Sequence, residues 1–332
     1  MPTLRAVRIG FDVSPLHRPH PPGIVRVVRE TVAALERRGR VEVVRLAPPE
    51  GAKLRSWRAH ELPQAATELD GLHSFLSAFP LRGPGARVQT IHELPWLHGV
   101  VENADLAHRF WNWVGPLRAH AVVTATEYTA RDLRARWLPG RARVRVIPWG
   151  VGAPFGPALL ERVQVIFCPG ASRAKKGLAA VIDGVAWLDE RPTLVVTGPR
   201  TAEFERCELR ARAAGVKLLY REHLDEEELV LHYRSSIATA LLSHSEGFGL
   251  PVLESMACGT PVIVPRDSAQ AEVAGPAGLR VDPESPESVA SAIDHARGER
   301  AELRAKGVER ARGVSWNRTA AGIEELWAEI LR

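Results

Sequence analysis

The stretch that decides the fold is SHSEGFGLPVLESMACGTPVIV, residues 243–264. It begins inside IATALLS (237–243), which has the apolar, β-branched character of a buried strand. PVLESMAC (251–258) has helical spacing, and PVIVP (261–265) has strand character again. A strand, a glycine-containing loop, a helix and a second strand in this order predict a βαβ unit of a parallel sheet.

The loop EGFG (246–249) of this unit is expected at the carboxyl edge of the sheet, where doubly wound folds bind ligands. Pro251 stands near the first helical position, where a missing N–H costs nothing. The start of the helix presents free amides and the positive end of its dipole, which favours a phosphate. Gly247 and Gly249 permit a close approach of the backbone. The loop therefore predicts a phosphate-binding site.

Two glutamates flank this loop: Glu246 at the end of the strand and Glu254 one turn into the helix. Carboxylates accept hydrogen bonds from vicinal hydroxyls. One carboxylate on each side of a phosphate site suits a nucleotide sugar, with ribose on one side and hexose on the other. From the residues alone, an exposed loop glutamate and an ordinary helix glutamate remain the alternative.

A second stretch of the chain also favours phosphate. CPGASRAKKGL (168–178) follows a predicted strand and opens a predicted helix, with positive charge from Arg173, Lys175 and Lys176. The order of residues does not match a Walker A loop. A strand followed by a basic, glycine-containing loop and a helix is a common pattern. It therefore adds support to the phosphate site at the EGFG loop but does not define a site by itself.

Strand patterns alternate with amphipathic helical patterns along almost the whole chain, which argues for parallel sheets covered on both faces. This many units would overfill one sheet, and 332 residues favour two domains. A run with three glycines and three prolines at 148–164 marks the boundary, and 315–332 predicts a final helix capped by Ser315. Nine strands are predicted, at 6–13, 88–94, 121–126, 143–148, 163–170, 193–198, 216–220, 237–243 and 261–265.

Composition excludes several classes of protein. No stretch approaches the roughly 20 apolar residues that span a bilayer, and the first residues lack a cleavable signal pattern. We therefore expect a cytoplasmic protein. The 3 cysteines form no CxxC pair and are expected to be reduced. No DxD triplet and no metal-ligand spacing occur, so no metal site is predicted.

Charge is unevenly distributed. Residues 1–155 carry 22 Lys and Arg against 13 Asp and Glu, whereas the remainder carries 22 against 26. Much of the excess lies at 131–146, where a solvated helix and an outer strand with outward arginines are the simpler interpretation. The functional alternative is attraction of an acidic acceptor, or peripheral contact with the inner face of a membrane. No nucleic-acid motif appears, and nucleic acid is not an expected partner.

Several segments of the chain resemble those of a known family. EGFGLPVLESMACGTPVI (246–263) closely resembles the E-x7-E signature of retaining glycosyltransferases of family 4, which have the GT-B fold. Further segments resemble that family in the same order: TIHELPWLH (90–98), ATEYTARDL (125–133), VIPWGV (146–151), GASRAKKGL (170–178) and DEEELVLHY (225–233).

The resemblance implies roles for individual residues on the donor side. Glu246 would contact the donor sugar and Glu254 the ribose hydroxyls. The amides of Phe248, Gly249 and Leu250 would face the sugar and the diphosphate.

It also implies roles for residues elsewhere. Lys176, with Lys175 and Arg173 as further basic residues, would neutralise the diphosphate. His92 would lie near the donor sugar, and Gly23 would lie in the loop after the first strand. The chain departs from the family in having Ala171 at a position where many members have arginine, and Glu93 where the family has aspartate.

The implied fold is α/β, with two doubly wound Rossmann-like domains facing a central cleft. Residues 1–155 would form the acceptor side and 156–312 the donor side, and 313–332 would form a helix that crosses back to the N-terminal domain. The implied activity is metal-independent, retaining transfer of a hexose from a GDP- or UDP-linked donor to a glycan, lipid-linked or small-molecule acceptor, with no separate cofactor.

Two other functions remain open. A glycoside hydrolase with two carboxylates would not need Lys176 or a phosphate site. A nucleotide-sugar-binding protein without turnover would keep the same residues. A nicotinamide oxidoreductase is disfavoured, because no GxGxxG follows a predicted strand.

Overall fold

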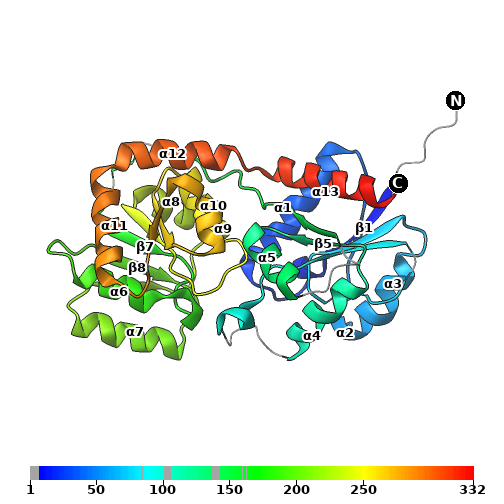
Figure 1. The fold of residues 1–332 in the computed structure, drawn as a ribbon, viewed down its shortest axis with the longest axis horizontal. Coiled ribbons are helices and arrows are strands. Elements are labelled where there is room, and N and C mark those ends of the chain that lie inside the picture. Colours follow the sequence, from blue (N-terminus) through cyan, green and yellow to red (C-terminus); the bar gives the residue numbers. More distant parts are fainter. Residues whose placement is uncertain are drawn as a thin grey trace. The chain divides into compact units, whose positions relative to one another are not determined.

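The computed structural model describes residues 7–78, 80–83, 85–100, 106–136, 143–158, 160–161 and 163–332. The chain divides into two compact units. The first consists of the residues up to Gly150 together with Ser315–Arg332, and the second of Val151–Val314. Each unit is a parallel sheet with helices on both faces (Figure 1). The predicted α/β class with two doubly wound sheets is confirmed.

The first sheet has the strand order β2-β1-β3-β4-β5-β6, and all its pairs are parallel. Its inner strands are almost wholly buried, as expected for a parallel sheet covered on both faces. The strand order reverses between β1 and β3, so this sheet has a switch point there. The strands are β1 (Arg8–Asp12), β2 (Glu42–Leu46), β3 (Gly71–Ser74), β4 (Ala86–Thr90), β5 (Ala121–Thr124) and β6 (Arg143–Val146).

The last helix of the chain belongs to the first unit, as predicted. Ser315 caps it, because its side chain accepts a hydrogen bond from the amide of Arg318. The helix packs against α1, and Arg38 and Glu324 form a 2.8 Å ion pair between them (Figure 1). The helices of this unit are α1 (Pro22–Arg38), α2 (Leu54–Ser56), α3 (Leu62–Ala65), α4 (Leu106–Val114), α5 (Glu127–Arg136) and α13 (Trp316–Ile330).

The second sheet has the strand order β12-β11-β10-β7-β8-β9, again wholly parallel. The order reverses between β7 and β10. The loops that follow these two strands therefore leave the same edge side by side. The strands are β7 (Val165–Cys168), β8 (Thr193–Thr197), β9 (Leu218–Arg221), β10 (Ala238–Ala240), β11 (Val262–Pro265) and β12 (Gly278–Val281).

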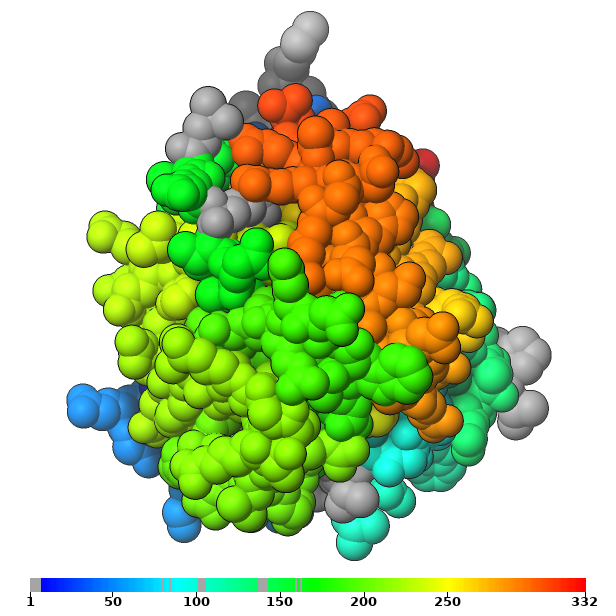
Figure 2. Space-filling view, turned by 90° about the vertical axis from the view of Figure 1, so that its left-hand side faces the viewer, coloured from blue at the N-terminus to red at the C-terminus, as the bar shows by residue number. Residues whose placement is uncertain are grey.

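Helices α6, α7 and α11 share one apolar core with the second sheet, and Figure 2 shows them next to one another on the surface. Helices α8 and α9 pack around Phe167, Tyr233 and Cys258. All three cysteines are buried and free. The helices of this unit are α6 (Leu178–Ala186), α7 (Ala202–Ala213), α8 (Glu226–Ser235), α9 (Leu250–Ala257), α10 (Ala269–Ala274), α11 (Pro286–Gly298) and α12 (Arg300–Arg312).

The nine predicted strands are all present, and the described residues contain three more: β2, β3 and β12. These three lack a strong apolar pattern. β3 reads Gly-Leu-His-Ser, yet all four residues are buried. Of the basic stretch 131–146, residues 137–142 lie outside the described part, and the rest forms the end of α5 and the edge strand β6.

Candidate functional site

The two predicted phosphate-binding stretches meet at the switch point of the second sheet. One loop follows β7 and ends in a short turn at Ala174–Lys176, and the other runs from the end of β10 to the start of α9. Because β7 and β10 are parallel neighbours, both loops leave the carboxyl edge together. The amide of His244 donates a 2.8 Å hydrogen bond to the carbonyl of Lys175 and joins the loops.

A glycine makes this close contact possible. Gly177 has φ +68°, and a Cβ there would lie 2.0 Å from the carbonyl oxygen of Leu242. The left-handed conformation and the lack of space both require glycine. The basic loop is therefore held against the end of β10 by its backbone.

Lys176 and Glu246 form an ion pair across the two loops, in which Lys176 Nζ donates to Glu246 Oε1. The side chains are 21% and 16% exposed, so water screens the pair only in part. Burial raises the pKa of Glu246, but the charges of Lys176 and Lys175 outweigh it, and the pKa lies below its ordinary value. Glu246 is therefore an anion at neutral pH, paired with Lys176.

Lys175 is only 7% exposed, which is unusual for lysine. It lies in the turn that carries Lys176 and contributes to the lowered pKa of Glu246. Arg173 stands just before this turn and is half-buried. The loop thus places a concentrated positive charge at the carboxyl edge of the sheet.

Helix α9 begins at Leu250 after Gly249, which has φ +93°. No side chain caps this helix start, and Pro251 occupies its first turn. The first amides of the helix are therefore not satisfied by a side-chain cap, which is the arrangement that favours an anion. Phe248 and Leu250, on either side of Gly249, are buried, at 6% and 9% exposed.

Glu254 lies one turn into α9 and is 6% exposed. Tyr233 of α8 donates a 2.9 Å hydrogen bond from its hydroxyl to Glu254 Oε2. A buried carboxylate with a defined donor is held in one orientation. The interpretation of Glu254 as an ordinary surface residue of a helix is wrong.

Further polar atoms around these loops have no hydrogen-bond partner among the residues that the structure describes. They are Ser172 Oγ, Ser245 Oγ and Gln270 Oε1, all buried. Ser172 belongs to the loop after β7, Ser245 to the loop after β10, and Gln270 packs beside Gly249. Buried polar atoms without partners are rare in folded proteins. A polar ligand at this edge fits such a set of atoms.

The structure thus brings together Lys175, Lys176, Glu246 and Glu254 with the start of α9 in one unit. His92 and Gly23 belong to the first unit. His92 follows β4 and its Nε2 lies 2.7 Å from the carbonyl oxygen of Phe75.

His92 and Gly23 lie in different environments. A carbonyl only accepts, so His92 carries its proton on Nε2. Burial lowers the pKa of His92, which keeps it neutral at pH 7. Gly23 lies exposed in the first turn of α1, rather than in the loop before this helix, where the resemblance placed it.

Sequence reasoning missed a buried charged cluster at the carboxyl end of β1. Asp12 is fully buried, and Arg58 Nε lies 3.5 Å from its Oδ2. The guanidinium also donates a 3.0 Å hydrogen bond to Ser14 Oγ. Arg58 comes from a segment 46 residues along the chain, so no local pattern pointed to the pair. The role of Tyr233 was missed for the same reason.

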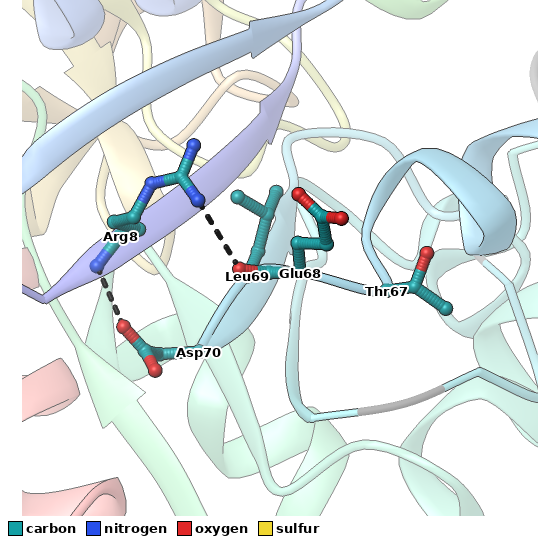
Figure 3. A pocket seen from close by; sticks show the side chains of 5 residues that line it. All are labelled: Arg8, Thr67, Glu68, Leu69 and Asp70. Carbon is teal, nitrogen blue, oxygen red and sulfur yellow. Dashed lines mark hydrogen bonds between the residues drawn. The ribbon is translucent and has the colours of Figure 1, made fainter.

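A separate cavity of about 490 Å³ opens at the amino end of β1 and β3 (Figure 3). It is lined by Arg8, Thr67, Glu68, Leu69 and Asp70. The amide of Arg8 donates to Asp70 at 2.8 Å, and its guanidinium contacts the carbonyl of Glu68 at 3.4 Å. These contacts tie β1 to β3 at the edge opposite the ligand-binding edge of a parallel sheet. This cavity is therefore not the candidate site.

Within the described ranges, no group of three or more His, Cys, Asp or Glu side chains could hold a metal ion. In the same part of the chain, no helix is both long and apolar enough to cross a bilayer.

Comparison with solved structures defines the class of fold. The chain has a TM-score of 0.78 to sucrose-phosphate synthase from Thermosynechococcus elongatus, at 20% identity, covering 97% of this chain and 98% of that one. It has a TM-score of 0.73 to Anabaena HepE in complex with UDP and glucose, at 15% identity, covering 97% and 100%. The fold is that of the GT-B glycosyltransferases, as the sequence resemblance implied.

Sequence comparison is more specific for the second unit. Residues 155–314 match the family model described as Glycosyl transferases group 1. A D-inositol 3-phosphate glycosyltransferase from Acidothermus cellulolyticus is 32% identical over 241 residues, which cover 64% of this chain and 54% of that protein. An O-antigen chain mannosyltransferase B from Escherichia coli is 33% identical over 100 residues, 29% of this chain and 26% of that one. The aligned parts thus span little more than half of these relatives at most.

Proposed function

We propose that this protein is a glycosyltransferase that moves a hexose from a nucleotide sugar to an acceptor hydroxyl, with retention of configuration and without a metal ion. One observation carries the proposal. At one edge of one sheet, Lys176 is paired with Glu246, and the buried carboxylate of Glu254 lies beyond an uncapped helix start. Positive charge and an uncapped helix start thus lie in the same pair of loops as the two carboxylates.

Each residue has a chemical task in this proposal. The lysines and the first amides of α9 bind the diphosphate and stabilise its charge as the glycosidic bond breaks. Glu254 accepts hydrogen bonds from the ribose, and Glu246 orients the hexose. When the donor binds, Lys176 exchanges part of its contact with Glu246 for the phosphate. His92 near the hexose remains a prediction for the first unit.

The family match of residues 155–314 and the UDP-bound structure of HepE, which has the same fold, support a nucleotide-sugar donor. We propose a GDP- or UDP-linked hexose. The acceptor hydroxyl would belong to a glycan, a lipid-linked sugar or a small molecule.

The glycoside hydrolase is the weaker alternative. Glu246 has a lowered pKa and a lysine partner, so it is a poor general acid at neutral pH. A binding protein without turnover would keep every feature of the site, and only a turnover measurement separates it from an enzyme.

The test is binding followed by turnover. Thermal unfolding is measured with UDP, GDP, ADP and TDP, each with and without EDTA. A ligand at 100 times its Kd stabilises by about 2.7 kcal/mol. No shift with any nucleotide would contradict the proposal, and a shift abolished by EDTA would contradict the metal-free part.

Turnover is measured with the matching nucleotide sugars, and the anomeric configuration of the product is read by NMR. Lys176→Ala is expected to lower kcat about 10²–10³-fold, as for the loss of one donor that stabilises developing charge. Product with inverted configuration, or an unchanged kcat in a folded Lys176→Ala variant, would refute these assignments.

We further propose that the first unit contacts an anionic membrane surface through α4. The side chains of Leu106, Phe110 and Trp113 are 83%, 50% and 64% exposed, and their spacing places them on one face of that helix. Arg109 on this helix and Arg118 just after it in the chain are exposed. An apolar stripe with a tryptophan and flanking arginines suits the interface of an anionic bilayer.

The test is co-sedimentation with vesicles. Binding to anionic phosphatidylglycerol vesicles is compared with binding to neutral phosphatidylcholine vesicles. Trp113→Ser should lose binding to the anionic vesicles. Trp187→Ser is the matched control, because Trp187 in the second unit is also 64% exposed. Equal loss in both variants, or no binding by the parent protein, would overturn it.

A further inference from the structure

The hydrogen bond between Tyr233 and Glu254 lies behind the candidate site rather than inside it. Tyr233 is fully buried in α8, and its hydroxyl lies 2.9 Å from Glu254 Oε2. The two residues come from different helices, 21 residues apart in the chain. Nothing in the roles proposed above uses this tyrosine.

The surrounding residues hold the tyrosine ring rigidly. Its centroid lies 5.2 Å from that of Phe167 and 6.0 Å from that of Phe155, both in edge-on geometry. Its backbone carbonyl accepts a hydrogen bond from Thr260 Oγ1. A capping box between Asp225 and the first turn fixes the start of α8. The hydroxyl therefore has one position, determined by the core of the unit.

A fixed donor on one oxygen determines the rotation of the whole carboxylate. Glu254 has several rotatable bonds, and at 6% exposure it receives little help from water. Two vicinal hydroxyls are recognised well only when the acceptor oxygens are already oriented. The core hydroxyl thus prepares Glu254 before a ligand arrives.

We propose that Tyr233 is a positioning residue that orients Glu254 toward the ribose hydroxyls, so that the site selects ribonucleotide over deoxyribonucleotide donors. This inference rests on the proposed function. Tyr233 would then determine the selectivity for the ribose of the nucleotide without touching the donor itself.

Tyr233→Phe is the appropriate change, because it keeps the ring and its packing and removes only the hydroxyl. Affinity is measured by calorimetry for UDP, GDP and their 2′,3′-dideoxy analogues. The variants are then compared with whichever of UDP and GDP binds the parent protein more tightly, and with the dideoxy analogue of that nucleotide. The parent protein should prefer the ribose form, and Tyr233→Phe should weaken that form by about fivefold to tenfold. Affinity for the dideoxy form should stay within about twofold, since that ligand lacks the groups that Glu254 recognises.

Two further variants calibrate the result. Glu254→Gln should remove most of the preference for ribose. Tyr128→Phe removes a tyrosine hydroxyl that contacts His98 in the first unit, and it should leave both affinities unchanged. Circular dichroism and the unfolding midpoint confirm that each variant is folded.

The possible outcomes distinguish failure of the proposed function from failure of the inference about Tyr233. If the parent protein binds no nucleoside diphosphate, the proposed function fails and the inference fails with it. If it binds ribose and dideoxy forms equally, the function stands and the inference is overturned. If Tyr233→Phe weakens both forms by the same factor, the hydroxyl is merely structural, which also overturns the inference. Selective loss of the ribose form supports it.

Discussion

The change Glu246→Gln tests whether the two loops of the site are arranged for a diphosphate. Glutamine keeps the size of the side chain and removes its charge. In the structure, Lys176 is paired with Glu246. Removal of that charge releases the lysine, and the affinity for a nucleoside diphosphate should stay the same or increase. Transfer should nevertheless fail, because the contact that orients the hexose is lost.

The magnitude follows from the exposure of the pair. An exposed ion pair contributes about 0.2–1 kcal/mol, and a hydrogen bond to a charged group about 1.5–3 kcal/mol. With side chains 21% and 16% exposed, the Lys176–Glu246 pair lies between these cases. We expect about 1 kcal/mol, which corresponds to nucleoside diphosphate binding up to about fivefold tighter. The rate of transfer should fall at least about 10²-fold.

Calorimetry at pH 7 over a series of salt concentrations measures the affinity, and initial rates measure transfer. Glu302→Gln is the control, since it breaks a Lys–Glu pair on α12, away from the site. Nucleoside diphosphate binding more than about tenfold weaker would refute the reasoning, as would transfer within about twofold of the parent protein.

The variant also has a predictable pH dependence. The pKa of Glu246 is lowered from 4.5, so the charged form is favoured by folding. Its contribution to stability is present above pH 4.5 and is lost as the pH falls through the lowered pKa. Urea unfolding should therefore separate the parent protein from Glu246→Gln at pH 7 and bring them together in acid.

Two further changes test the fold around these features. Gly177→Ala should destabilise the second unit by more than about 2 kcal/mol, from strain at φ +68° and the clash with the carbonyl of Leu242. Gly156→Ala, with nothing within 4 Å, is the control in thermal unfolding. Burial lowers the pKa of His73 from 6.5 to about 3, so acid favours the unfolded state. Between pH 7 and pH 5, the parent protein should lose about 2 kcal/mol more than His73→Phe in urea unfolding. An equal loss would show that His73 titrates normally.

Much of the second unit could be predicted from local pattern. The strand, EGFG loop and helix at 237–258 appear where the sequence placed them, with the glycine and proline at the turn into α9. Ser315 caps the last helix, as its position predicted. These features depend on neighbouring residues, whose backbone preferences act over one or two turns.

Other features could not be predicted, because their partners are distant in the chain. The strand β3 has no apolar pattern, and His73 is fully buried with Phe11 and Phe75 stacked on it. Gly71 cannot be larger because Trp327, from the far end of the chain, fills the space beside it. Strand propensity is weak compared with such burial.

The sequence by itself determined the class of fold, the positions of the two loops and the residue types in the site. Only the tertiary structure decided that Lys176 contacts Glu246 and that Tyr233 holds Glu254. The physical reason is the range of the forces involved. Backbone propensity and apolar periodicity act locally along the chain, whereas an ion pair or a buried hydrogen bond depends on which strands become neighbours when the sheet forms.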